Sequence, residues 1–207
     1  RANPAAGKRG TERGNARNRI EQGRSLLRRG EATKPTNFYD DDAHLRRTRA
    51  FRWGGARLAE VEPLLRQAGA DSAGPVNSAS ALLDRAENLP RLEPWNGIGE
   101  RTEAIVFHPA YHEVGRLVWR SRVLSVLGEP GNVALHTALA YLWAQNGEVP
   151  HGCAVACTSG LIKAIQRCGS DWMRHEWLPR LLAPDYDRRW HGAQFLTEVQ
   201  GGSDVGA

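Results

Sequence analysis

The residues best suited to chemistry lie near the end of the chain, in the run Phe195-Leu196-Thr197-Glu198-Val199-Gln200-Gly201-Gly202-Ser203-Asp204. We predict a strand over 194–197 that delivers Thr197, whose hydroxyl and amide can both hydrogen-bond. Gly201 and Gly202 then allow a tight turn and a close approach of backbone to a ligand. Ser203 adds a hydroxyl and backbone N–H groups that can surround a phosphate oxygen. The run suits a flat heteroaromatic with a diphosphate tail, and taken alone it also fits a surface hairpin loop.

Two pairs of potential metal ligands have helical spacing. His108 and His112 would share one helix face, as metal-binding histidines do. Pro109 places His108 at a helix start, and no carboxylate or cysteine with ligand spacing accompanies the pair, which favours structural histidines. Cys153 and Cys157 fall on a helix of small apolar residues, where buried packing is the expected role. No metal site is predicted.

The run near the C-terminus resembles the signature of the acyl-CoA dehydrogenases, whose usual form is Thr-Glu-Pro-x-Ala-Gly-Ser-Asp. Upstream, Trp177-Leu178-Pro179-Arg180-Leu181-Leu182 is similar to the family's Tyr-Leu-Pro-x-Leu segment. Here Val199 replaces the proline, and Gln200 and Gly201 precede Gly-Ser-Asp. Together with Phe107-His108-Pro109-Ala110-Tyr111-His112, this form resembles the AidB, or adaptive-response, branch of the family. The resemblance covers roughly residues 38–207.

The resemblance implies a mainly α fold, namely the N-terminal helical domain of the acyl-CoA dehydrogenase fold followed by the first strand of a middle β-domain. It also implies FAD as cofactor, bound between the middle and C-terminal domains and usually across a subunit interface. The expected partners are an acyl-CoA or related small molecule and the remaining domains, or a second chain, that complete the flavin site. A homo-oligomer is expected.

The same resemblance assigns roles to five residues. Thr197 matches the family threonine that hydrogen-bonds the flavin ring, and Gln194 and Leu196 match positions that contact the flavin. Gly202 and Ser203 match the turn that contacts the FAD diphosphate, and Ser203 also matches a contact to the CoA part of the substrate. Gln194 departs from the residue common in ordinary dehydrogenases.

The activity implied is that of an FAD-dependent oxidoreductase acting on CH–CH groups, by α,β-dehydrogenation of an acyl thioester. In the family the base that removes the α-proton is a glutamate of the C-terminal helical domain, so no residue of this chain is assigned as catalytic. We therefore expect the isolated chain not to catalyse the reaction, and flavin reduction by the isolated chain would refute this. The only methionine is Met173, and we expect the chain to be a piece of a longer protein.

Apolar spacing predicts the helices that must position these residues. We expect a helix within 38–69, capped at its start by Asp40–Asp42 and ended by Gly69. A loop over 70–77, a short helix to Glu87 and an irregular stretch over 88–104 should follow. Further helices are expected within 110–145, with a break at 128–131, over 152–167 up to Gly169, and from the Ser170-Asp171 cap to Leu182. The seven tryptophans are expected mostly to pack between helices.

The charge divides the chain unevenly. Residues 1–34 hold ten Lys or Arg and three Asp or Glu, a net charge of +7, whereas the whole chain carries +5. We predict a basic, flexible arm over 1–37 with a short helix near Ile20–Arg29, a helical domain over 38–190, and the start of a β-domain over 191–207. The alternative function is a non-catalytic helical module whose basic arm binds nucleic acid or a partner protein. No run of 18 apolar residues suggests a membrane span, and three clustered cysteines fit a reducing compartment, so a soluble, cytoplasmic protein is expected.

Overall fold

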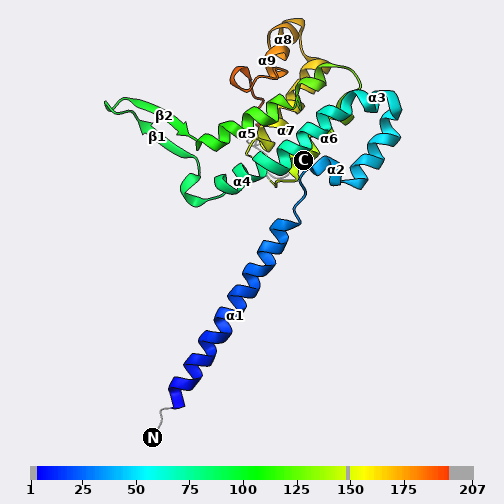
Figure 1. The fold of residues 1–207 in the computed structure, drawn as a ribbon. Coiled ribbons are helices and arrows are strands. Elements are labelled where there is room, and N and C mark those ends of the chain that lie inside the picture. The colour runs from blue at the N-terminus through cyan, green and yellow to red at the C-terminus, as the bar shows by residue number, and fades with distance from the viewer. Residues whose placement is uncertain (1–3, 148–149, 196–207) are drawn as a thin grey trace, which may run out of the picture. The chain divides into compact units, whose positions relative to one another are not determined.

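The computed structural model describes the backbone of residues 4–147 and 150–195, and side chains from residue 17 onward within those ranges. The chain forms two separate units, residues 1–35 and residues 36–207. The first unit is one helix, α1 (Pro4–Ala32), which extends well beyond the short helix predicted at Ile20–Arg29 (Figure 1). Its described side chains are mostly exposed, so the helix has no core of its own.

The second unit begins with two capped helices, α2 (Phe38–Asp41) and α3 (Ala43–Asp71). The Asn37 side chain accepts from the backbone N–H groups of Tyr39 and Asp40 and so caps α2. The Asp42 carboxylate accepts from the Leu45 N–H at 2.7 Å and caps α3, which confirms the predicted aspartate cap at that position. α3 bends at Gly54, whose φ of 66° departs from helical geometry.

The predicted stop at Gly69 and the predicted loop over 70–77 are both wrong. α3 continues to Asp71, passes through one π-helical turn (Ser72–Val76) and runs into α4 (Asn77–Leu83). Gly69 serves packing instead, because a β-carbon there would lie 2.2 Å from Asn37 Oδ1 and 2.6 Å from the Tyr39 nitrogen. Pro75, which has no N–H to donate to a helical hydrogen bond, lies inside the π-turn.

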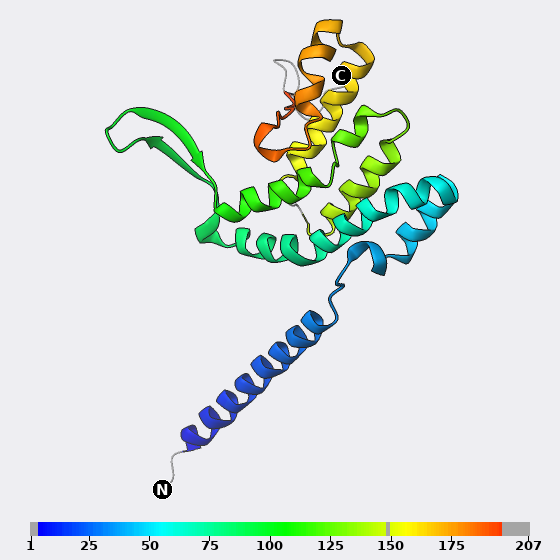
Figure 2. The ribbon, with the colours of Figure 1, turned by 45° about the horizontal axis from the view of Figure 1, so that its top comes forward.

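The stretch 88–104, predicted to be irregular, contains an antiparallel hairpin of β1 (Arg91–Trp95) and β2 (Arg101–Val106) after a 3₁₀ turn (Ala86–Asn88). The prediction was wrong because the prolines and glycines of this stretch lie at positions where a hairpin tolerates them. Pro94 falls where the register shifts between Glu93 and Trp95, a position that needs no ladder N–H, and Gly99 takes a φ of 80° in the turn. Figures 1 and 2 both show the hairpin extending beyond the helices.

The rest of the described chain is helical, in the order that apolar spacing predicts. The elements are α5 (Pro109–Arg120), a 3₁₀ turn (Ser125–Gly128), α6 (Val133–Ala144), α7 (Gly152–Cys168), α8 (Asp171–Glu176), α9 (Leu178–Leu181) and a 3₁₀ turn (Tyr186–Arg188). The end of α7 at Gly169 and the Ser170 cap of α8 are confirmed. The break predicted at 128–131 begins earlier, because α5 already ends at Arg120 and residues 121–128 form turns before α6 starts at Val133. The last predicted helix divides at Trp177, and α9 starts at Leu178 with Pro179 in its first turn.

One hydrophobic core joins α3, α5, α6 and α7. Its most deeply buried large side chains are Tyr39, Leu65, Val76, Val114, Val118, Trp119, Leu124, Leu127, Leu139, Leu142 and Ile162. Trp119 and Trp143 lie in this core as predicted, whereas Trp95, Trp172 and Trp190 are exposed. The predicted mainly α fold is confirmed. Among the described residues, no helix is both long enough and apolar enough to cross a bilayer.

Candidate functional site

The chain approaches the predicted ligand-binding run across the surface of α7. The His191 ring stacks on Trp119, with ring centroids 5.3 Å apart. Gly192 then donates its N–H to Thr158 Oγ1 at 2.9 Å, and the same hydroxyl donates to the Ala154 carbonyl at 2.6 Å. Thr158 is fully buried, so this hydrogen bond is shielded from water. The segment leading to Gln194 is therefore attached to α7 at a defined point.

Gly192 permits this attachment because it has no side chain. A β-carbon at this position would lie 2.9 Å from the Cys157 carbonyl oxygen and 3.0 Å from Thr158 Cα. Both are backbone atoms of a 17-residue helix, which cannot yield locally. The glycine is thus required by close approach of two backbones.

Gln194 is the one predicted flavin-contacting residue whose side chain the structure describes. It is exposed, and a β-carbon added at Gly160 would lie 4.0 Å from its Nε2 atom, so its amide lies over the Gly160 turn of α7. Gln194 and Phe195, the described half of the predicted strand, are not paired in a sheet. Leu196, Thr197, Gly202 and Ser203 lie outside the described residues, so their roles stay predictions.

The face of α7 beside Gln194 carries only small side chains. Cys153, Ala156, Gly160 and Ala164 are exposed, and Cys157 is partly exposed. An apolar hollow of about 550 Å³ opens along part of this face and is lined by Cys153, Ala156, Ser159 and residues of α5 and α6. A flat or elongated apolar ligand could therefore approach the helix closely at this face.

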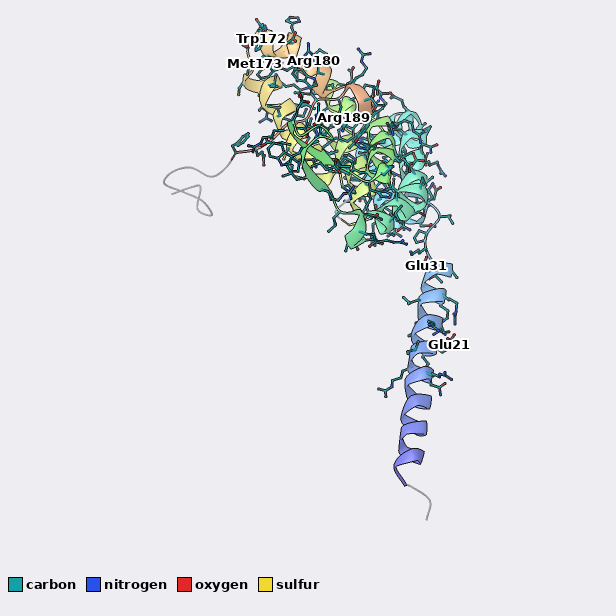
Figure 3. The ribbon with its side chains drawn as sticks, turned by 90° about the vertical axis from the view of Figure 1, so that its left-hand side faces the viewer. Glu21, Glu31, Trp172, Met173, Arg180 and Arg189 are labelled. Atoms are coloured by element: carbon teal, nitrogen blue, oxygen red, sulfur yellow. The ribbon has the colours of Figure 1, made fainter. Side chains whose placement is uncertain are left out.

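An aromatic–histidine cluster beneath the segment, made of Tyr111, Trp119, His151, Tyr186 and His191, holds it in place. The His151 ring centroid lies 4.2 Å from that of Tyr111 and 5.5 Å from those of Trp119 and Tyr186. Arg189 covers the cluster, with its guanidinium carbon 3.3 Å from the Tyr186 ring centroid. Figure 3 labels Arg189 at its place near α9.

His151 is completely buried within this cluster. Its Nε2 lies 2.9 Å from the Tyr111 carbonyl oxygen, which can only accept, so Nε2 carries the proton and donates. Nδ1 has no partner among the described residues. The pKa of His151 is lowered from 6.5 to about 4, chiefly by burial and also by the nearby Arg189, His191 and His112, while the hydrogen bond to the Tyr111 carbonyl opposes the shift. The pKa of His191 is also lowered, first by burial and then by Arg189.

These shifts predict that the fold loses stability as the pH falls from about 6.5 towards 4. In that window the unfolded chain takes up a proton at His151 that the folded chain excludes, so unfolding becomes more favourable. The loss should be on the order of 3 kcal/mol when complete. The free energy of unfolding, measured by urea denaturation across this window, should decrease as the pH falls, and its slope against pH is the quantity to compare. His151→Gln, which keeps a donor for the Tyr111 carbonyl, should flatten the slope, and an unchanged slope in the variant would contradict the assignment.

The two predicted ligand pairs have different outcomes. His108 caps α5 through Nδ1, which accepts from the Ala110 N–H at 3.2 Å, and His112 Nδ1 lies 2.9 Å from the Tyr186 hydroxyl. Each ring thus has a structural hydrogen-bond partner, and the absence of a metal role stays a prediction. Buried packing is wrong for Cys153, which is exposed, and its Sγ lies 4.0 Å from that of Cys157.

Several residues of the site were not predicted from the sequence, notably His151, Thr158, His191 and Gly192. Thr158 and Gly192 are 34 residues apart, and His151 and the Tyr111 carbonyl are 40 residues apart. No local spacing relates residues that far apart. The small side chains of α7 did indicate that another part of the chain packs closely on this helix. They could not indicate that this part is the segment at Gly192.

The fold and the approach to the ligand-binding run define the class of protein: the N-terminal helical domain of the acyl-CoA dehydrogenase fold. A profile of the adaptive response protein AidB N-terminal domain family matches residues 29–188. The chain belongs to this family.

Comparisons with individual proteins agree with this class. Acyl-CoA dehydrogenase family member 11 of Caenorhabditis elegans is 28% identical over 124 residues, which are 56% of this chain and 20% of that protein. The structure of Bd2924 in its apo-form superposes with a TM-score of 0.72 at 21% identity, over 83% of this chain and 34% of Bd2924. The Caenorhabditis elegans ACDH-11 structure in complex with C11-CoA superposes with a TM-score of 0.68 at 24% identity, over 83% of this chain and 30% of ACDH-11. The chain thus spans a fifth to a third of these proteins.

Proposed function

We propose that this chain forms one wall and the first segment of the flavin site in an FAD-dependent acyl-CoA dehydrogenase-like oxidoreductase. The observation that carries the proposal is the attachment of the segment 191–194 to α7, with the Gln194 amide over Gly160 and beside an exposed face of small side chains. The segment leads directly into the run whose signature matches the flavin-binding run of that family. The remaining domains, or a second copy of the protein, would complete the site.

The described residues fit a flavin. Its ring system is flat and carries hydrogen-bond donors and acceptors along one edge. The small side chains of α7 leave a surface that a flat ring can approach, and the Gln194 amide can both donate and accept. When bound, FAD would supply the hydride-accepting chemistry. Gln194, Leu196 and Thr197 would orient the ring, and Gly202 and Ser203 would hold the diphosphate, with Ser203 also touching the CoA portion.

The substrate class we propose is an acyl thioester. The C. elegans neighbour was solved with C11-CoA, an acyl-CoA of medium length. In this chain, the apolar hollow of about 550 Å³ along α7 offers an acyl chain a water-excluding surface next to the proposed flavin position. The chain's contribution would therefore be to hold the acyl part and exclude water.

The reaction is tested on the protein purified from its native source, under anaerobic conditions. Addition of undecanoyl-CoA should bleach the absorption of bound oxidised flavin within the first turnover, because the hydride moves to the flavin. Free CoA at the same concentration is the control and should cause no bleaching. Flavin that stays oxidised with acyl-CoA thioesters of every chain length would contradict the dehydrogenation.

A second candidate function is nucleic-acid binding by α1, and the arrangement of its arginines favours it. Positions 17, 24 and 28 fall on one face of an α-helix, and all three are arginine. Arg24 and Arg28 share a single carboxylate, that of Glu21, so the row keeps a net positive charge. Figure 3 labels Glu21 on this helix. Most of this helix, up to residue 28, lies before the residues that the family profile matches. Arginine suits phosphate recognition, and α1 has too few apolar residues to insert into a bilayer.

The row of arginines should determine the affinity for a fluorescein-labelled DNA duplex. The triple variant Arg17→Gln, Arg24→Gln and Arg28→Gln should weaken binding about tenfold or more. The slope of log affinity against log salt concentration should become shallower by the amount expected for the loss of about three phosphate contacts. The double variant Arg19→Gln and Arg29→Gln, which removes arginines from other faces, is the control and should change binding less per arginine removed. Equal losses per arginine, or stronger binding to anionic vesicles than to DNA, would contradict a nucleic-acid row.

A further inference from the structure

Two cysteines lie one helical turn apart on the open face of α7. Cys153 Sγ and Cys157 Sγ are 4.0 Å apart, both thiols are free, Cys153 is exposed and Cys157 is partly exposed. The helix fixes their relative position, so a ligand that bridges them would not have to order the chain first.

The helical spacing disfavours a disulfide but suits a bridging atom. β-Carbons one turn apart on a helix are separated by about 5–6 Å, whereas a disulfide requires about 3.5–4.5 Å. When one metal ion bonds to two sulfur atoms at about 2.3 Å each, the two sulfurs are about 3.8 Å apart at a tetrahedral S–metal–S angle and about 4.6 Å apart at a linear angle. The Sγ–Sγ distance of 4.0 Å lies between these two limits.

We propose that Cys153 and Cys157 form a two-thiolate site for a single soft, thiophilic ion, with Cu⁺ as the biological ligand. Thiolates select soft ions such as Cu⁺ over hard ones. Zinc prefers four protein ligands in structural sites, and no cluster of three or more potential metal ligands occurs among the described residues. A site limited to two thiolates therefore favours an ion that accepts two ligands.

The surroundings of the pair support thiolate ligands. Cys153 is the second residue of the 17-residue helix α7, so its exposed thiol lies at the start of the helix, one turn before that of Cys157. Cys153 also lines the apolar hollow, which limits the access of competing water to one side of the site. Binding converts two thiols and Cu⁺ into a dithiolate complex and releases two protons, without a change in oxidation state.

Copper(I) titration in competition with a chromophoric chelator, under anaerobic and reducing conditions, tests the proposal on the whole protein. One Cu⁺ should bind per chain with high affinity. Cys153→Ser and Cys157→Ser should each weaken this binding about 100-fold or more, because the second thiolate acts at a high effective concentration. Cys168→Ser is the matched control, since Cys168 is an exposed thiol at the other end of the same helix, and it should bind as the wild type does.

Loss of the high-affinity binding in Cys168→Ser, or its retention in Cys153→Ser, would overturn the proposal. Phenylarsine oxide gives a second readout, because its arsenic bonds to two thiols with loss of one water. Mass spectrometry should show this dithiol adduct in the wild type and in Cys168→Ser, but in neither of the other variants. Ready conversion of Cys153 and Cys157 to a disulfide in air would contradict the geometric argument. None of these readouts requires bound flavin.

Discussion

Replacing Gly192 by alanine should detach the segment that leads into the proposed flavin site while leaving the helical body folded. The new β-carbon would meet the Cys157 carbonyl oxygen at 2.9 Å and Thr158 Cα at 3.0 Å, and neither backbone atom can move without distorting α7. Overpacking of this kind costs about 1–3 kcal/mol. Because the segment follows the last packed helix, the cost should appear as local opening and not as global unfolding.

Two measurements should show the detachment. Tryptic cleavage at Arg189, three residues before Gly192, should become about tenfold faster, since about 1.4 kcal/mol shifts an opening equilibrium tenfold. The flavin content of the purified protein should fall in parallel. Gly152→Ala is the control on the same helix, because a β-carbon there meets nothing within 4 Å. An unchanged cleavage rate in Gly192→Ala would show that the segment is not held as described.

Replacing Gly115 by alanine should destabilise the whole helical body. Gly115 is buried within α5, and a β-carbon at this position would lie 2.0 Å from Tyr186 Cε2. The Tyr186 ring would have to leave its place against Trp119 and His151, and with it the hydrogen bond to His112 and the contact with Arg189. We expect a loss of about 1–3 kcal/mol in the free energy of unfolding.

Whether Gly115→Ala lowers or raises the free energy of unfolding distinguishes an effect of packing from an effect of helix propensity. Alanine is intrinsically a better helix former than glycine, so at an open helical position the substitution should stabilise by about 0.5–1 kcal/mol. Gly55 is such a position in α3, with nothing within 4 Å of its added β-carbon. Chemical denaturation should therefore shift in opposite directions for Gly115→Ala and Gly55→Ala. Stabilisation by Gly115→Ala would contradict the packing of Tyr186 on α5.

The sequence predicted the helices whose signals are local. Apolar spacing identified α5, α6 and α7, and Ser170 and Gly169 marked real helix boundaries because capping depends on neighbouring residues alone. The glycine and proline signals failed where tertiary packing decided the outcome. Gly69 looked like a helix stop, but it makes room for Asn37 and Tyr39, a contact across about 30 residues that the sequence does not reveal.

The candidate site was predicted only in part, for a related reason. Gln194 was identified from the signature that it precedes, and the structure places its amide over α7. The cluster that holds the segment was not predicted, because Tyr111, His151 and His191 come from three separate parts of the chain. The exposure of Cys153 was also missed, since a small-residue helix looks the same in sequence whether its face is covered or open.

The visible absorption spectrum of the protein purified from its native source, taken with the intact mass of every chain in the preparation, tests the central claim most directly. We expect a band at about 450 nm, characteristic of oxidised flavin, together with protein mass beyond that of these 207 residues. A colourless protein with the mass of this chain alone would contradict the flavin site, and the helical domain with its basic helix would then be the better account.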